Sequence, residues 1–244
     1  MTATPLIAVT NLRKSFGTNE VLKGVNFSVN EGENLVILGR SGSGKSVTIK
    51  CLVGLIPTDE GEMKVFGTDV AQLSYQELNE IRLRIGFLFQ GGALYDSMSV
   101  RDNLSFTLKH HSPKLSNEEV QTRILEVLEN VGLAESIDKM PSELSGGMVK
   151  RTAVARTLII KPEIILYDEP TAGLDTITSR EISDLILAVQ KKYKTTSIII
   201  THDMACAKST GNRIMILKDG VINAAGTYDE LEKSSDEWVR SFFI

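Results

Sequence analysis

The chain has 244 residues, enough for one large domain or two small ones around a substantial hydrophobic core. It carries 31 acidic and 27 basic residues, and the net charge of −4 argues against a nucleic-acid-binding protein that relies on a basic surface. Its two cysteines, Cys51 and Cys206, lie far apart, so we expect neither a disulfide framework nor a zinc site.

The N-terminal residues lack the basic start and apolar core of a secretory signal. No apolar run elsewhere approaches the roughly 18 residues that a membrane-spanning helix needs. We therefore expect a soluble, cytoplasmic chain. If it works at a membrane, a partner must supply the membrane-spanning part.

The early apolar residues alternate with polar ones, which is typical of strands with one buried face. Val25, Phe27 and Val29 form such a series, with a polar residue after each of the first two. Near the C-terminus, the apolar runs 214–217 and 221–222 flank Lys-Asp-Gly, which predicts a hairpin.

Three later apolar runs, at residues 35–38, 164–167 and 198–200, do not alternate. Strands that are apolar on both sides belong in a parallel sheet that helices cover on each face. The carboxyl ends of such strands meet at one crevice, where ligands bind. These runs therefore predict a parallel sheet with a ligand site at one edge.

Helical patterns separate these runs. Ser116 with Glu119 forms a capping box ahead of an apolar stripe, and Ser74 with Glu77 repeats the same start signal. Residues from about 91 to 155 are mostly helical in pattern and interrupt the β-rich parts. Because no Pro/Gly/Ser-rich linker divides the chain, we expect one domain over residues 1–244, an α/β core with a helical insertion.

A phosphate-binding loop is predicted at residues 39–46, which fit G-x-x-x-x-G-K-[ST] between a buried strand and a helix. Its glycines let backbone amides surround a phosphate, Lys45 supplies positive charge, and the Ser46 hydroxyl can hold Mg²⁺. A chance glycine-rich turn is the alternative, and the strand-loop-helix context disfavours it. The predicted nucleotide-binding residues are Gly39, Arg40, Ser41, Gly42, Ser43, Gly44, Lys45, Ser46 and Val47.

Two carboxylates end the buried run 164–167. Asp168 is predicted to bind Mg²⁺ through its water shell, and Glu169 to polarise the attacking water. Alone, such a pair could be a solvated strand end. Downstream of a matching phosphate loop, the functional interpretation is favoured.

Two further polar residues end predicted strands. His202 follows the run 198–200, so it should lie near Lys45 and Asp168 and could touch a γ-phosphate. Gln90 ends the run 85–89, where its amide could meet the metal or the lytic water. The alternative for each is a purely structural side chain.

The sequence as a whole resembles the ATP-binding-cassette (ABC) ATPase family. The matching pieces stand in the family's order: residues 39–46, Gln90, residues 144–147, residues 164–169, residues 172–175 and His202. The resemblance implies ATP and Mg²⁺ as ligands. It also implies a P-loop NTPase (RecA-like) α/β core with an N-terminal antiparallel β-subdomain and an inserted α-helical subdomain.

The Leu-Ser-Gly-Gly stretch at 144–147 matches the family signature. In this family two cassettes pair head to tail, so the resemblance implies a homodimer. Ser145, Gly146 and Gly147 would then grip the γ-phosphate of the ATP bound by the partner, at a positive helix N-terminus. Asp175 would lie in the loop that crosses the interface.

The resemblance assigns Phe16 to stacking on adenine, with an ordinary core aromatic as the alternative. Two residues depart from the family pattern. Met148 replaces the usual Gln after the signature, and we expect activity to survive because Ser145 and the glycine amides make the phosphate contact. Thr176 replaces the usual Pro of the crossing loop, which affects the rigidity of that loop.

Three stretches, residues 89–94, 140–148 and 172–179, look like the ATPase subunits of Mla/Mce-type phospholipid transporters. That resemblance implies an integral membrane permease of the MlaE type, an MCE-domain lipid-binding protein of the MlaD type and a small STAS-domain protein of the MlaB type. The chain would then sit on the cytoplasmic face of the inner membrane, and residues 91–103 would cradle a coupling helix of the permease.

Two alternative functions stay open: the ATPase of an importer for amino acids or other small solutes, and a soluble ABC ATPase of an assembly machine. The apolar residues 237–243 leave a second choice open. They could pack on a neighbouring subunit or on the core of their own chain.

Overall fold

The computed structural model describes residues 4–243. Its strands are β1 (Ile7–Phe16), β2 (Asn19–Val29), β3 (Asn34–Leu38), β4 (Glu60–Val65), β5 (Thr68–Asp69), β6 (Ile85–Leu88), β7 (Ile164–Asp168), β8 (Thr196–Thr201), β9 (Arg213–Lys218) and β10 (Val221–Gly226). Its α-helices are α1 (Lys45–Leu52), α2 (Tyr75–Arg82), α3 (Val100–His111), α4 (Asn117–Asn130), α5 (Gly146–Leu158), α6 (Thr176–Tyr193), α7 (Met204–Thr210), α8 (Tyr228–Glu232) and α9 (Glu237–Arg240).

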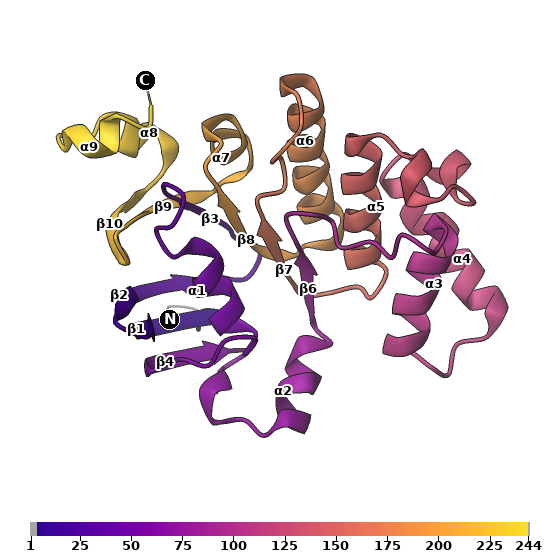
Figure 1. Ribbon diagram of the computed structural model, residues 1–244, viewed down its shortest axis with the longest axis horizontal. Helices are drawn as coiled ribbons and strands as arrows, with labels where there is room; N and C mark the ends of the chain where they lie inside the picture. The colour runs from indigo at the N-terminus through magenta and orange to yellow at the C-terminus, as the bar shows by residue number, and fades with distance from the viewer. Residues whose placement is uncertain (1–3, 244) are drawn as a thin grey trace.

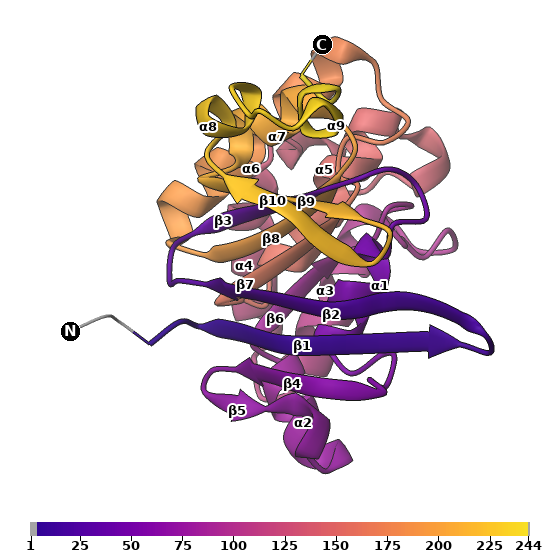
Figure 2. The same ribbon diagram turned by 90° about the vertical axis from the view of Figure 1, so that its left-hand side faces the viewer.

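The first sheet is antiparallel, with strand order β2-β1-β4-β5. On β2, Val25, Phe27 and Val29 are buried, and the residues between them are more exposed, as the alternating pattern predicts. This sheet packs below the second one in Figure 2. It is the N-terminal antiparallel β-subdomain.

The second sheet has the strand order β10-β9-β3-β8-β7-β6, and all its pairs are parallel except β9 with β10. The prediction of a parallel sheet is confirmed. The hairpin is confirmed too: Asp219 and Gly220 both have positive φ, 48° and 85°, as a tight two-residue hairpin turn needs.

Both faces of this sheet are covered, which explains why its strands do not alternate. On β3, Val36 packs into a hydrophobic cluster with helices α3 to α7, and its neighbours Leu35 and Ile37 pack into a second cluster with the first sheet and α1. Ile199 and Ile200 of β8 divide between the same two clusters. Each full burial of this kind contributes about 1.5–3 kcal/mol.

Helices α3, α4 and α5 form an insertion between β6 and β7, at the right of Figure 1. The predicted capping boxes are present, with Ser74 and Ser116 each accepting from the backbone amide three residues on. The insertion differs from the prediction at its ends: residues 89–99 form no helix, and α5 continues to Leu158.

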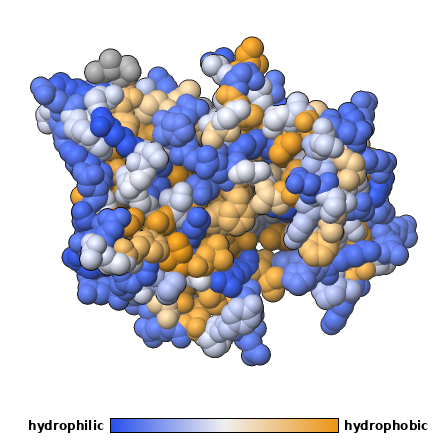
Figure 3. Space-filling model, in the orientation of Figure 1, coloured by the Kyte–Doolittle hydropathy of each residue, from blue (hydrophilic) through white to orange (hydrophobic). Residues whose placement is uncertain are grey.

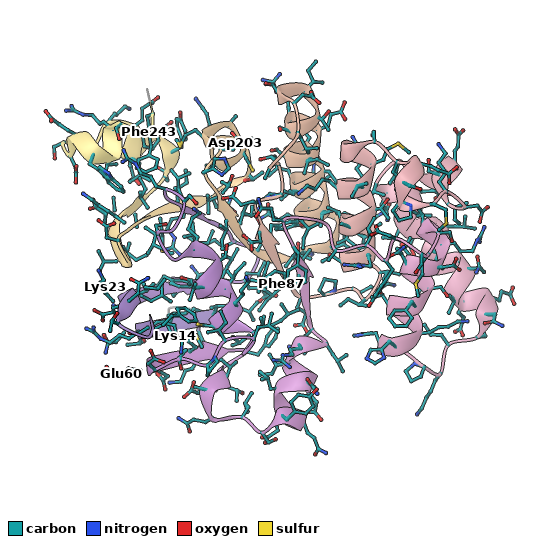
Figure 4. All side chains as sticks on the ribbon, viewed as in Figure 1. Lys14, Lys23, Glu60, Phe87, Asp203 and Phe243 are labelled. Atoms are coloured by element: carbon teal, nitrogen blue, oxygen red, sulfur yellow. The ribbon has the colours of Figure 1, made fainter. Side chains whose placement is uncertain are left out.

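The C-terminal segment packs on its own chain. Trp238, Phe242 and Phe243 contact the cluster beneath α7 and α8, and Figure 4 labels Phe243 among these helices. Of the two alternatives for residues 237–243, packing on the chain's own core is therefore confirmed. None of the helices in residues 4–243 combines the length and hydrophobicity that crossing a bilayer requires.

Candidate functional site

A cavity of about 440 Å³ opens at the carboxyl ends of β3, β7 and β8. It brings together residues of the first sheet, of α1 and of the segments that follow β3, β6, β7 and β8. Its lining residues are Phe16, Val21, Ser41, Gly42, Gly44, Lys45, Ser46, Val47, Gln90, Glu169 and His202. Most of the residues predicted from separate sequence motifs therefore meet at one place.

The loop between β3 and α1 has the shape of an anion cradle. Gly42 and Gly44 have φ of 79° and 103°, and a Cβ on Gly44 would lie 2.7 Å from a methyl carbon of Leu22. The first amides of α1 have no partner within the helix. The buried Ser43 hydroxyl has no hydrogen-bond partner among residues 4–243. These free donors fit a phosphate group.

The Lys45 ammonium lies in the middle of this loop. Its Nζ donates to the carbonyl oxygens of Gly39 and Arg40 at 2.8 and 3.1 Å, and it lies 3.9 Å from Oε1 of Glu169. Burial lowers the pKa of Lys45, and the charges of Glu169 and Asp168 oppose that shift. The lysine contributes a concentrated positive charge where a nucleotide's phosphates would lie.

The Ser46 hydroxyl donates to Oδ1 of Asp168 at 2.9 Å. Asp168 is buried at the end of β7, whereas Ser46 lies in the first turn of α1. A carboxylate and a hydroxyl are oxygen ligands of the kind that Mg²⁺ prefers. The predicted metal pair is therefore adjacent, and its chemistry fits Mg²⁺.

Glu169 occupies a strained turn directly after β7. Its φ is 50°, which is uncommon for a residue with a side chain. Oε2 lies 2.9 Å from Nδ1 of His202 and accepts from the His202 backbone amide at 3.3 Å. The carboxylate is buried and held by its neighbours, as a general base requires.

Gln90 and Phe16 line the cavity from outside the parallel sheet. The strand before Gln90 ends at Leu88, one residue earlier than predicted, and Gln90 is exposed. Phe16 ends β1 and is 49% exposed, so the alternative of a core aromatic is wrong. Val21 also lines the cavity; the sequence interpretation missed it because an apolar residue on an alternating strand carries no chemical signal.

The signature residues lie elsewhere. Ser145 caps α5, and its hydroxyl accepts from the Met148 amide at 3.3 Å. Ser145 and Gly146 are exposed, and neither they nor Gly147 lines the cavity around Lys45. This second cradle is therefore open to solvent and separate from the first within one chain.

Asp175 caps α6. Its carboxylate accepts from the backbone amides of Ile177 and Thr178, both at 3.0 Å, and from the Thr178 hydroxyl at 2.6 Å. This capping lowers the pKa of Asp175 through its hydrogen bonds with Thr178. Asp175 thus shapes the loop that ends at α6.

A larger hollow of about 610 Å³ lies between α6 and α7 and is lined partly by Thr171 and Asp203. Figure 4 labels Asp203 at the start of α7. The hollow includes His202 but neither Lys45 nor Asp168. It therefore offers no phosphate cradle, and the smaller cavity is the chemical site.

Sequence and structure comparisons identify relatives. The sequence profile of the ABC transporter family matches residues 22–172. A probable ribonucleotide transport ATP-binding protein of Mycobacterium leprae is 39% identical over 97% of this chain, which spans 68% of that protein. The intermembrane phospholipid transport system ATP-binding protein MlaF of Haemophilus influenzae is 37% identical over 97% of this chain and 89% of its own length.

A solved structure matches the fold as well. The ATP-binding cassette MJ0796, in a dimeric post-hydrolysis state with ADP and Pi, superposes with a TM-score of 0.83 at 34% identity. The match covers 91% of this chain and 98% of the other. With the profile match, these likenesses confirm the predicted fold and the ATP and Mg²⁺ ligands. The chain belongs to the ABC transporter family, as an ATP-binding subunit that hydrolyses ATP.

Proposed function

We propose that this chain powers phospholipid transport between an inner and an outer membrane through a separate permease. The MlaF relative carries this proposal, because it matches along nearly the full length of both chains. The ribonucleotide-transport relative has similar identity but extends well beyond this chain. A lipid cargo is therefore favoured over a small solute.

Binding begins at the phosphate loop. Lys45 exchanges its bonds with the carbonyls of Gly39 and Arg40 for bonds with the phosphates of ATP, at little geometric cost because its position is already fixed. Ser46 and Asp168 would hold Mg²⁺, and the bound ion would neutralise the charge that develops on the phosphates. The ring of Phe16, exposed at the cavity, stacks on the adenine.

Hydrolysis uses the carboxylate at the end of β7. Glu169 accepts the proton of the attacking water, and His202 keeps the carboxylate in place from one side. The Gln90 amide, at the rim of the same cavity, orients that water. The buried setting of Glu169 strengthens these interactions.

The second cradle acts on a partner's nucleotide. In a head-to-tail homodimer, Ser145 and the amides of Gly146 and Gly147 grip the γ-phosphate that the other copy binds. Two observations support this role: Ser145 and Gly146 are exposed, and none of the three residues lines the chain's own cavity. The loop capped by Asp175 crosses the interface. Cleavage of the γ-phosphate removes the bridge and lets the dimer open.

An apolar groove offers a docking place for the permease. It has a volume of about 490 Å³ between β6, the loop after it and α5, and its lining includes Phe87, Phe89 and Tyr95. Tyr95 packs edge-on against Phe106, and both rings are nearly half exposed. Figure 3 shows apolar surface gathered in the middle of this face, where it is hollowed. A coupling helix of the permease would fill this groove.

The likeness to the MlaF relative supports three partners for the proposal: a permease of the MlaE type, an MCE-domain protein of the MlaD type and a STAS-domain protein of the MlaB type. Through the permease, the chain is peripheral to the cytoplasmic face of the inner membrane. Purification of the tagged chain from membranes tests this. An integral permease together with an MCE-domain protein supports lipid transport.

Two other results would contradict the lipid cargo. Recovery of a permease with a solute-binding protein would favour a small-solute importer. The similarity to the ribonucleotide-transport relative is the observation that keeps this alternative. Recovery of non-membrane partners alone would favour an assembly machine. Labelled phospholipid moving between donor and acceptor vesicles, only with ATP and the purified complex, would support the proposal directly.

A further inference from the structure

Lys150 is a buried lysine on α5, the helix that begins at the signature. Its Nζ donates to the backbone carbonyl of Gln90 and, at 3.5 Å, to that of Glu169. Among the described residues, no carboxylate oxygen lies within 4.0 Å of this ammonium. Its full charge is therefore directed at two carbonyls, and both belong to residues that line the nucleotide cavity.

Arg156, six residues further along α5, makes the same kind of contact. It donates to the carbonyls of Gly92 and Ala93 at 3.1 and 2.5 Å. Together Lys150 and Arg156 hold the loop that follows β6 at three carbonyls. Helix α5 thus fixes the path of this loop from Gln90 to Ala93.

Two of the positions held by these cations are strained. Glu169 and Ala93 both have φ of 50°, and the carbonyl oxygen of each accepts a hydrogen bond from a cation of α5. Such a backbone conformation is unfavourable unless its surroundings stabilise it. A charge-assisted hydrogen bond to the carbonyl is a contact that can supply this stabilisation.

Placing an ammonium here has a cost of its own. Burial lowers the pKa of Lys150, and the nearby charges of Glu169 and Asp168 oppose the shift. A buried cation whose main partners are neutral carbonyls stabilises the chain less than an apolar side chain of similar shape would. The burial of Lys150 is better explained by its role in holding the backbone at Gln90 and Glu169.

We propose that Lys150 is a positioning residue for hydrolysis. It ties the signature helix to the two turns that carry Gln90 and Glu169, so the orientation of α5 sets where the amide and the carboxylate point. This inference rests on the proposed role of the signature in binding the partner's ATP. Binding of the partner's γ-phosphate at Ser145 would then shift α5, and α5 would in turn change the position of Glu169, the proposed base of the same chain.

The test separates positioning from nucleotide binding. Lys150→Met keeps an unbranched side chain but removes the donor, so kcat should fall about 10- to 100-fold. The Kd for ATP with Mg²⁺ should stay within about twofold, because Lys150 does not touch the phosphate loop. Lys150→Gln, whose amide can still donate to a carbonyl, should recover most of the lost rate.

The matched control is Lys192→Met. Lys192 is exposed on α6 and donates to the Asn130 side chain, far from the turns at Gln90 and Glu169. Its kcat and Kd should match the parent chain. If Lys150→Met does not fold, Lys150→Gln is compared with Lys150→Asn, which is equally polar but too short to reach either carbonyl; only the Gln variant should be active.

Three outcomes would overturn the proposal: a parental kcat in Lys150→Met, equal losses in the Gln and Asn variants, or parallel changes in kcat and Kd. ATP-driven dimerisation of Glu169→Gln, with and without Lys150→Met, distinguishes this failure from that of the proposed function. The single and the double variant should both dimerise with ATP if Lys150 serves only to position Gln90 and Glu169. If the single variant Glu169→Gln stays monomeric with ATP, the proposal that the signature binds a partner's ATP is wrong. The kcat comparison among the Lys150 variants still tests the positioning role of Lys150 in that case.

Discussion

The chain has two glycine-containing cradles at helix N-termini, and they differ in their surroundings. The loop at residues 39–46 lies in a cavity with Asp168, Glu169 and His202 around it. The signature at residues 144–147 is largely exposed, and its Ser145 hydroxyl only caps its own helix. The same backbone chemistry therefore has two different surroundings. The first cradle is complete in the polar side chains that its own chain supplies, whereas we propose that the second binds the nucleotide of a partner.

The largest expected effect concerns the base beside the complete cradle. Glu169→Gln should lower kcat by about 10²- to 10⁴-fold, because an amide cannot accept the proton of the attacking water. ATP binding should persist, since Lys45 and Ser46 are unchanged, and the closed dimer should accumulate. Steady-state ATPase rates and size-exclusion chromatography with ATP measure both effects. Parental turnover would remove Glu169 from this role.

Loss of charge in the first cradle should weaken ATP binding, whereas added bulk in the second should leave ATP binding by each monomer unchanged. Lys45→Ala should weaken ATP binding by about 10²-fold, because the buried ammonium is the main charge facing the phosphates.

Ser145→Arg should abolish hydrolysis while each monomer still binds ATP. Calorimetric titration with ATP and Mg²⁺ gives both affinities. Normal hydrolysis by Ser145→Arg would show that no second chain completes the site.

A pair of glycine substitutions should separate folding from assembly. Gly44→Ala should lower the free energy of unfolding by about 1–3 kcal/mol, because φ is 103° and the new Cβ would meet Leu22. Gly146 lies in the helix α5, and a Cβ there would lie 3.4 Å from Leu174, so Gly146→Ala should not lower the free energy of unfolding. Hydrolysis should fall, because the added methyl group lies in the proposed phosphate cradle of the signature. Urea denaturation without nucleotide gives the free energy of unfolding of both variants. An equal loss in Gly44→Ala and Gly146→Ala would contradict the prediction that only Gly44 is needed for folding.

The smallest effect is expected at the rim of the complete cradle. Phe16→Ala should weaken ATP binding about 10-fold through lost stacking on the base. The maximal rate should change little, because Phe16 lies apart from the carboxylates. Titration of the variant with ATP and with triphosphate alone tests this. If both ligands weaken equally, stacking is not the cause.

Much of the complete cradle could be predicted because its motifs are local. The loop at residues 39–46 follows a buried strand, and Asp168, Glu169 and His202 stand at strand ends, so parallel pairing alone brings them together. The alternating and non-alternating apolar runs likewise indicated which strands have one covered face and which have two.

What sequence could not provide depends on tertiary placement. The contacts of Lys150 with Gln90 and Glu169 join three segments that no motif links, and a lysine side chain is ordinarily exposed to solvent. The positive φ of Glu169 and the packing of residues 237–243 on their own core also follow from neighbours distant in sequence.

The central claim is that residues from two chains enclose each ATP. Specific ATPase activity should be measured over a dilution series, with the mass of the species in solution recorded at each concentration. The account predicts that activity per chain falls as the dimer dissociates, in proportion to the dimer fraction. Full activity per chain at dilutions where only single copies are present would contradict it.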